Sequence, residues 1–150
     1  RPVGRWETLP PPPFRRRALA AASHAGTLVV LGGLTEIGGV VKTVDFYDPA
    51  RRTWSRGPDL RGSRLEGFAP SAFEVGGRVY VSGRDGVVRR LNAAGDAWED
   101  VSKLAVPRLT HRLLPGIAND VLAVGGNSAG KPVRLVESVP VGGPRVTPGG

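Results

Sequence analysis

Uninterrupted apolar runs recur at three places along the chain, and glycine follows each of them closely. The runs are residues 28–31, 79–82 and 121–124. Continuous rather than alternating apolarity is typical of a strand that is buried on both faces. A period of about forty to fifty residues is typical of repeat architectures in which each unit buries its apolar face against the next. The pattern therefore predicts an all-β fold of three stacked units.

Three landmarks recur in the same order: a tryptophan, an arginine ten residues later, and a glycine pair after the apolar run. They are Trp6, Arg16, Gly32 and Gly33; then Trp54, Arg64 and Gly83; then Trp98, Arg108, Gly125 and Gly126. In the second copy, Ser82 is expected to replace the first glycine of the pair. The glycines are expected to let the backbone turn with positive φ and approach the next unit closely.

At these residues the chain resembles the kelch repeat. That repeat has a di-glycine closing an apolar strand, a turn like Tyr47-Asp48-Pro49, a tryptophan seven residues after the tyrosine, and a Pro-Arg opening the next unit. The resemblance covers roughly residues 5–140 and is strongest between residues 17 and 60. It implies four-stranded β-propeller blades, most often six in a ring, of which this chain holds half. The second copy departs from the pattern at Leu91-Asn92, and the third ends before any tryptophan.

Each repeat predicts four strands, from the innermost to the outermost. The alanine-rich residues 18–22 favour a helix by propensity, but the aligned segments 68–75 and 111–114 are bordered or interrupted by Pro70 and Pro115, which do not suit helix interiors. All three segments are therefore predicted as innermost strands. Third strands are expected at residues 42–47, 87–91 and 133–138, and outer strands around Trp54 and Trp98, whose rings would fill the gaps between blades. The blades then span residues 11–60, 61–104 and 105–139.

The two ends of the repeat array are unequal. Residues 1–10 hold an outer strand at residues 5–9 with no blade before it, and the third blade lacks its outer strand. Three blades are too few for a ring, because propellers have roughly four to eight. Either two chains form a two-fold six-bladed ring with exchanged N-terminal strands, or the chain is a fragment of a longer propeller, which the missing initiator Met favours. Residues 140–150, rich in Gly and Pro, are expected to form a disordered tail.

Composition narrows the chemistry further. The net charge of +8 is carried mostly by arginine and could attract acidic peptides, glycans or nucleic acid, although this composition also reflects a GC-rich, bacterial-type genome. Nucleic acid is not the favoured partner. The absence of Cys excludes disulfides and thiolate metal sites and leaves the compartment undecided. No apolar run is long enough for a signal peptide or a membrane span.

The residues predict no metal site, cofactor or catalytic group. His24 and His111 lie in different repeats without partners at ligand spacing. His111 follows Arg108 by three residues, as Gly67 follows Arg64, and the resemblance to kelch repeats implies a structural role for it. The copper radical oxidases of similar architecture need a cysteine cross-linked to tyrosine, which this chain cannot form.

The resemblance also implies a binding site. In kelch domains that bind acidic peptides, arginines at the start of the innermost strands and residues of the loops between second and third strands surround a central pocket. The matching positions are Arg16, Arg64 and Arg108, with Arg84 on a loop. Converging guanidinium groups favour bidentate binding of carboxylates. The competing interpretation is that each arginine pairs with a local carboxylate such as Glu66.

The predicted function is a protein-interaction module, or scaffold, for an acidic protein segment. One alternative is a sugar-acid enzyme like the kelch-type mutarotases of sialic acid. Another is a structural fragment with no site of its own. A Glu or His converging beside the arginines would favour the enzyme, whereas an arginine-lined face without a general base would favour binding.

Overall fold

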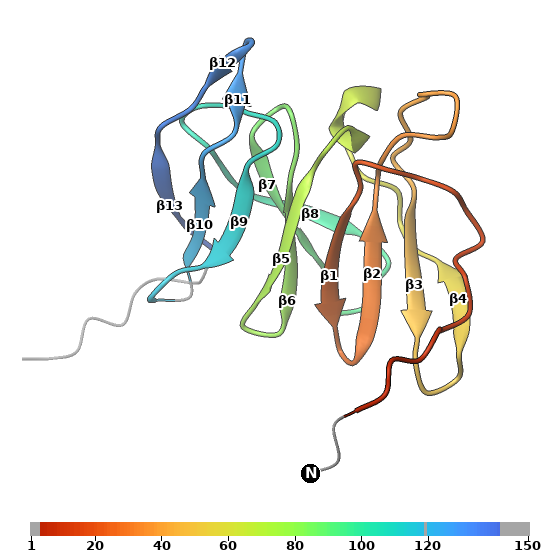
Figure 1. Ribbon diagram of the computed structural model, residues 1–150. Helices are drawn as coiled ribbons and strands as arrows, with labels where there is room; N and C mark the ends of the chain where they lie inside the picture. The colour runs from red at the N-terminus through yellow and green to blue at the C-terminus, as the bar shows by residue number, and fades with distance from the viewer. Residues whose placement is uncertain (1–3, 119, 142–150) are drawn as a thin grey trace, which may run out of the picture.

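The computed structural model describes residues 4–118 and 120–141, which form three blades of antiparallel strands standing side by side (Figure 1). Blade 1 comprises β1 (Ala20–His24), β2 (Thr27–Leu31), β3 (Val44–Asp48) and β4 (Thr53–Arg56). Blade 2 comprises β5 (Ser71–Val75), β6 (Arg78–Ser82), β7 (Val87–Leu91) and β8 (Trp98–Lys103). Blade 3 comprises β9 (Arg112–Pro115), β10 (Asp120–Val124) and β13 (Val136–Pro140), with a small hairpin of β11 (Asn127–Ser128) and β12 (Lys131–Pro132). The predicted all-β fold is confirmed.

The alanine-rich segment forms a strand, as predicted. β1 pairs along its whole length with β2, so the local preference of alanine for a helix yields to pairing within the sheet. A short 3₁₀ segment, η1 (Arg64–Gly67), is the one helical element among the described residues. None of the described helices has the length and apolarity needed to cross a membrane.

Two-residue turns join the first and second strands of blades 1 and 2. Ala25 and Gly26 have φ of 46° and 79°, and Gly76 and Gly77 have φ of 58° and 76°. Two successive positive φ values are typical of the hairpin turn whose twist matches that of the strands it joins. These turns keep both connections short and fix the register of each hairpin.

Strand pairing shows which positions of the blades correspond. The second-strand residues Val30, Val81 and Ala123 pair with the third-strand residues Asp45, Arg89 and Glu137, respectively. By this register the first residues after the second strands are Gly32, Gly83 and Gly125, and the next are Gly33, Arg84 and Gly126. Blade 2 therefore keeps the first glycine and replaces the second with Arg84. The expectation that Ser82 replaces the first glycine is wrong, because Ser82 is the last residue of β6.

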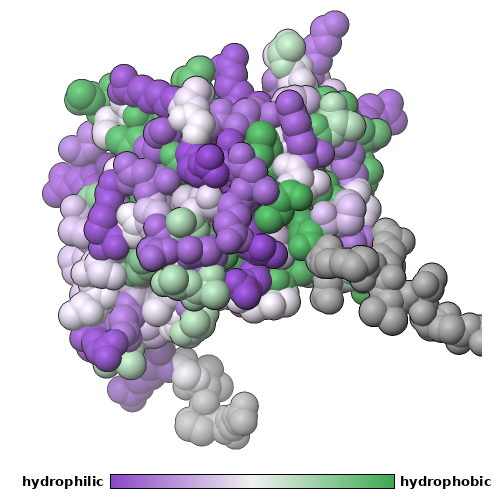
Figure 2. Space-filling view, turned by 180° about the vertical axis from the view of Figure 1, so that it is seen from behind, coloured by the Kyte–Doolittle hydropathy of each residue, from purple (hydrophilic) through white to green (hydrophobic). Residues whose placement is uncertain are grey.

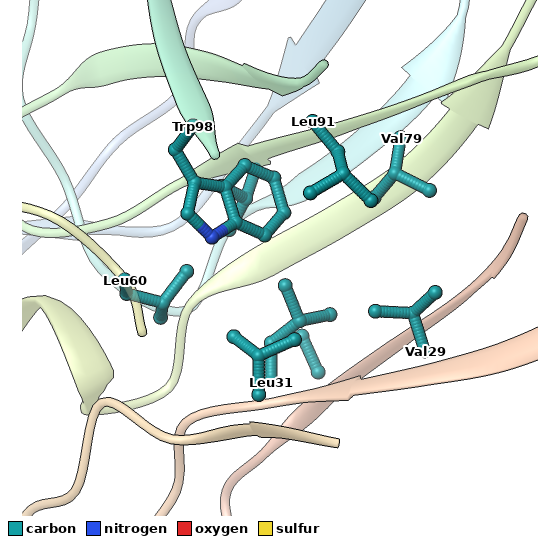
Figure 3. Close-up of a cluster of buried hydrophobic side chains, with 9 residues drawn as sticks. Val29, Leu31, Leu60, Val79, Leu91 and Trp98 are labelled. Atoms are coloured by element: carbon teal, nitrogen blue, oxygen red, sulfur yellow. The ribbon is translucent and has the colours of Figure 1, made fainter. Parts of the chain in front are cut away.

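Each gap between neighbouring blades holds an apolar core. In the gap between blades 1 and 2, Trp98 packs in one cluster with Leu31, Leu60 and Val79 (Figure 3). The core between blades 2 and 3 contains Val88, Leu104, Leu113, Val121 and Val139. Trp98 is 4% exposed, which confirms that its ring fills a gap between blades. Stacking of neighbouring units thus buries what one blade could not bury alone.

Both ends of the row of blades are open. Edge strand β13 has no further strand beside it within the described residues. Residues 5–9 form no strand, and the side chain of Trp6 is fully exposed. The outer strand expected there needs a sheet that the described residues do not supply, so it stays a prediction. The predicted disordered tail does not begin at residue 140, because Pro140 ends β13 and Val141 is buried in the core between blades 2 and 3. Residues 142–150 of that tail lie outside the described residues.

Candidate functional site

The candidate site lies at one end of the blades, which we call the loop face. It is formed by the segments that lead into the innermost strands and by the loops between second and third strands, residues 32–43, 83–86 and 125–135. In Figure 1 this end carries η1 and the β11–β12 hairpin. Backbone hydrogen bonds join the two kinds of segment, from Arg17 to Leu34 in blade 1 and from Leu109 to Asn127 in blade 3. All four arginines of the predicted binding set belong to these segments.

Arg16 is held inside blade 1. Its side chain is 3% exposed, and its Nη2 lies 2.5 Å from Oδ2 of Asp45 on β3. Nη1 donates to the carbonyl oxygen of Thr43 at 3.1 Å, and the guanidinium stacks 3.6 Å from the ring centre of Phe14. The guanidinium of Arg16 therefore ties the entering segment to the third strand and is not available to a ligand at the surface.

Arg108 occupies the same place in blade 3. Its side chain has no exposed area, and it forms an ion pair with Glu137 on β13. Nη1 donates to the carbonyl oxygens of Gly125 and Leu135 at 3.1 and 3.0 Å. Burial lowers the pKa of the Arg108 guanidinium. Arg108 thus fastens both ends of the long loop between β10 and β13.

Blade 2 departs from this arrangement. Arg16 and Arg108 stand four residues before their innermost strands, and the residue four before β5 is Gly67, not Arg64. The segment after Trp54 is three residues longer than its counterparts, and Arg64 begins η1. A Cβ on Gly67 would lie 1.8 Å from the carbonyl oxygen of Val41, so no side chain fits there.

In blade 2 the charges at these places have the opposite sign from those in blades 1 and 3. The third-strand position that carries Asp45 and Glu137 elsewhere carries Arg89, which lies 2.5 Å from Asp85 and 3.2 Å from Asp100. The entering segment contributes Glu66, which is 3% exposed and accepts a hydrogen bond from the Asp85 amide at 3.1 Å. The side chains of Glu66, Asp85 and Arg89 meet beside Gly62, where a Cβ would lie within 3.3 Å of each.

Burial and neighbouring charges set the pKa values of this cluster. Burial raises the pKa of Glu66, and the nearby Asp85 carboxylate raises it further. Burial alone would raise the pKa of Asp85, but hydrogen bonds from the Arg89 guanidinium and the Val87 amide lower it overall. Burial alone would lower the pKa of Arg89, but Asp85 and Asp100 raise it overall. Of the two carboxyl groups, Asp85 therefore ionises at the lower pH.

Arg64 and Arg84 are the two members of the predicted set that reach the surface. Both residues are exposed, and neither forms an ion pair with a carboxylate of the described residues. Arg64 Nε donates to the carbonyl oxygen of Val40 at 3.1 Å, which holds the side chain across the blade 1 loop. The structure brings neither of them into a ring with Arg16 and Arg108. Whether any of the four binds a ligand stays a prediction.

Arg84 borders a pocket between blades 2 and 3. The pocket has a volume of about 320 Å³ and is otherwise lined by residues 107–109 and 127–130. A larger hollow of about 460 Å³ lies between residues 12–15 and 35–37, where Arg15 is already paired with Glu36 at 3.2 Å. The smaller pocket is bordered by an exposed arginine that forms no ion pair within the described chain.

His111 lies inside the core of the loop face. It is 1% exposed, and within the described part of the chain neither ring nitrogen has a hydrogen-bond partner. Burial, together with the positive charges of Arg108 and Arg112, lowers its pKa to about 4. By register His111 corresponds to Leu19 and Pro70 rather than to Gly67. No three His, Asp or Glu side chains converge at metal-binding distance in the described residues.

Comparison with known proteins agrees with this geometry. The family model of the Kelch motif matches residues 15–61. A Putative F-box/kelch-repeat protein of Arabidopsis thaliana is 31% identical over 112 residues, which cover 67% of this chain. The chain belongs to the kelch-repeat family. Beta-scruin of Limulus polyphemus is 37% identical over 70 residues, 43% of this chain. Kelch repetition thus accounts for the common plan of the three blades.

A solved structure shares the fold. The structure of YjhT superposes with a TM-score of 0.69 at 15% sequence identity and covers 84% of this chain, but only 43% of the YjhT chain. The match covers 28% of the Arabidopsis protein and 8% of beta-scruin. The chain therefore spans less than a third of the curated kelch relatives it matches and less than half of the solved one.

Proposed function

We propose that this chain serves, as part of a kelch propeller, in a protein-interaction module that binds an acidic protein segment at the loop face. The observation that carries the proposal is the pair Arg64 and Arg84, two exposed guanidinium groups without an ion-pair partner in the described chain. Arginine at such a position can bind a carboxylate with two parallel hydrogen bonds. An acidic side chain is therefore the ligand group best suited to this surface.

The surroundings of Arg84 support the same ligand. The pocket of about 320 Å³ beside it is large enough for one side chain, and its other walls come from loops that Arg108 fastens. Arg16 and Arg108 then act as positioning residues that keep the loops in place. The chain's net charge of +8 would speed the approach of an acidic partner.

Burial of the acid–base groups favours binding over catalysis. Glu66 and His111 are 3% and 1% exposed, so neither is positioned to exchange a proton with a bound sugar. The enzyme alternative called for a Glu or His converging beside the arginines, and a general base must also come within hydrogen-bond reach of its substrate. We therefore retain the interaction module as the proposed function.

The experiment is a titration of the chain into a fluorescently labelled poly-glutamate peptide, followed by anisotropy at low salt. The double variant Arg64→Ala/Arg84→Ala is expected to weaken binding at least about tenfold, because hydrogen bonds to a charged group contribute about 1.5–3 kcal/mol each. Binding by the unchanged chain is expected to weaken as salt is raised, because exposed charges are screened.

A matched control separates this site from overall charge. The double variant Arg51→Ala/Arg78→Ala removes two positive charges from the opposite end of the blades, where Arg51 lies in the β3–β4 turn and Arg78 is the first residue of β6. It is expected to bind nearly as well as the unchanged chain. Equal loss of affinity in both double variants would show non-specific attraction and overturn the assigned site.

A further inference from the structure

In blades 1 and 2, the third-strand residue that pairs with the last residue of the second strand faces the following blade. Val44 and Val88 are both 0% exposed, because blade 2 covers the first and blade 3 covers the second. Val136 holds the same register position in blade 3, opposite Val124 as Val44 is opposite Leu31, and it is 60% exposed. One side of blade 3 therefore lacks the neighbour that its counterparts have.

Blade 1 has a corresponding exposed apolar residue on its opposite side. Val79 and Val121 face the preceding blade from their second strands and are both 0% exposed. Leu28 has the same register position in β2 and is 40% exposed. On the same face of blade 1, Val30 and Tyr47 are only 5% and 3% exposed, so the open part of this side is centred on Leu28. That part and the exposed side of blade 3 correspond to the two halves of an interface that the chain already builds twice internally.

A hydrogen bond holds the N-terminal segment of blade 1 as the end of a preceding blade's outer strand is held in blade 2. The Trp98 indole N–H donates to the carbonyl oxygen of Pro58 at 2.9 Å, and the Trp54 indole N–H donates to that of Pro10 at 3.4 Å. Pro58 stands four residues after Trp54, and Pro10 stands four residues after Trp6. Trp54 thus holds the end of the segment that carries Trp6, while the Trp6 side chain is fully exposed.

We propose that a second copy of this chain covers both open sides, so that two chains form a closed, two-fold, six-bladed ring. The N-terminal segment of each copy becomes the outer strand of the partner's blade 3. A two-fold arrangement makes the same contact twice and leaves no open blade. It also removes the free edge of β13, and unpaired strand edges invite further association.

The length of the chain is compatible with this closure. The match covers 43% of the solved propeller chain, so two copies together equal most of its length. Figure 2, seen from behind, shows hydrophobic residues reaching the surface on the side that holds blade 3, in a view that is otherwise largely hydrophilic. Blade 1 of a second copy, with its exposed Leu28, would supply an apolar surface to cover this side.

The register of the exchanged strand follows from the two complete blades. Trp54 pairs with Tyr47, and Trp98 pairs with Leu91. The matching residue of β13 is Val139, three residues after Val136 as Tyr47 is three after Val44. Trp6 of one copy is therefore expected opposite Val139 of the other, which places Glu7 opposite Ser138.

The first test is the molar mass of the full chain, measured by light scattering after size exclusion. A mass of twice 15.8 kDa across micromolar concentrations is the expected result. A monomer at every concentration would overturn the proposal and assign the open sides to blades of a longer chain. Assemblies larger than a dimer would also overturn it, because a closed two-fold ring has no free interface.

A substitution at the exchanged strand tests the contact itself. Trp6 is fully exposed within one chain, so Trp6→Ala is expected to leave the circular dichroism spectrum unchanged and to raise the dimer dissociation constant at least about a hundredfold. Ile37→Ala is the matched control, because Ile37 is 97% exposed on the blade 1 loop and is not part of the exchanged segment. A dimer that is unaffected by Trp6→Ala would contradict the strand exchange.

Cross-linking tests the register. The chain contains no Cys, so any disulfide must come from introduced residues. Directly opposite residues bring their Cβ atoms to about 5.5 Å or closer, near the reach of a disulfide. The double variant Glu7→Cys/Ser138→Cys is expected to form a covalent dimer on oxidation, which reducing agent reverses. If it cross-links no better than either single variant, the proposed register is wrong.

Discussion

Blades 2 and 3 carry opposite charges on their entering segments and on their third strands. In blade 3 the entering segment contributes the cation, Arg108, and the third strand contributes the anion, Glu137. In blade 2 the third strand contributes the cation, Arg89, and the entering segment contributes a buried carboxyl group, Glu66. Blade 1 follows blade 3, with Arg16 and Asp45.

This difference shows what each blade needs. In blades 1 and 3 an ion pair connects the entering segment to the third strand, whereas in blade 2 Arg89 pairs with Asp85 and Asp100, and Glu66 is linked to them through the Asp85 amide. Asp85 and Asp100 are 31% and 50% exposed, so solvent shares in stabilising their negative charges. In blade 3 the side chains of Arg108 and Glu137 are 0% and 13% exposed, so each charge is stabilised mainly by the other. The two blades should therefore respond differently to substitution and to pH.

The largest expected effect on stability comes from breaking the buried Arg108–Glu137 ion pair in blade 3. Arg108→Met leaves Glu137 buried without its cation and is expected to lower the free energy of unfolding by about 3–5 kcal/mol. The matched change in blade 2, Arg89→Met, is expected to lower it by about 1–3 kcal/mol, because its carboxylate partners are partly solvated. Urea denaturation followed by tryptophan fluorescence measures both values.

A double variant distinguishes a lost pair from lost packing. Arg108→Met/Glu137→Leu removes both charges and is expected to recover part of the stability that Arg108→Met loses. Recovery should be incomplete, because the carbonyl oxygens of Gly125 and Leu135 also lose their donor. Equal losses in Arg108→Met and Arg89→Met would contradict the contrast between the two blades.

A smaller effect is expected when pH is lowered, and it belongs to blade 3. His111 has a pKa of about 4 in the folded chain, against about 6.5 when it is unfolded. The unfolded chain therefore takes up the proton first, and stability is lost as pH falls from about 6.5 to about 4, by up to about 3 kcal/mol. Thermal denaturation across this range measures the loss, and His111→Leu should flatten it. A variant with the same pH dependence as the unchanged chain would exclude His111 as its source.

The smallest effect has the opposite sign and belongs to blade 2. The pKa of Glu66 is raised on folding, so this carboxyl group reduces stability as pH rises through its unfolded pKa toward its folded one. Glu66→Gln cannot ionise, and its amide can still accept from the Asp85 N–H. We expect it to be as stable as the unchanged chain at neutral pH or more so, by on the order of 1 kcal/mol. A marked loss of stability in thermal denaturation at neutral pH would show that the charge itself is needed.

The strands could be predicted from the sequence because their signals are local and repeated. Apolar runs closed by glycine locate β2, β6 and β10, and proline in the aligned segments excludes a helix at the start of blade 1. The register of blade 2 could not be obtained by counting from Trp54, because its entering segment is three residues longer and folds into η1. Gly67 consequently replaces Arg64 at the inner position.

The burial of Arg16 and Arg108 could have been inferred from their partners. Asp45 and Glu137 stand at corresponding places in their third strands, where a carboxylate is otherwise unexpected in a largely apolar sheet. An arginine and a carboxylate that recur together indicate an internal ion pair. The matching position of blade 2 holds Arg89, and this reversed sign hides the pattern when residue types alone are aligned.

The ion pair of blade 3 joins the segment before the first strand to the third strand, whereas in blade 1 Asp45 also lies 3.7 Å from Arg56 on the fourth strand. Blade 3 is therefore anchored by its inner three strands, and its outer strand is the part that another stretch of chain can supply. Chain termini created by circular permutation should be tolerated best between a third and a fourth strand. In evolution, the same junction is where a propeller gene could be divided or duplicated with every inner anchor left intact.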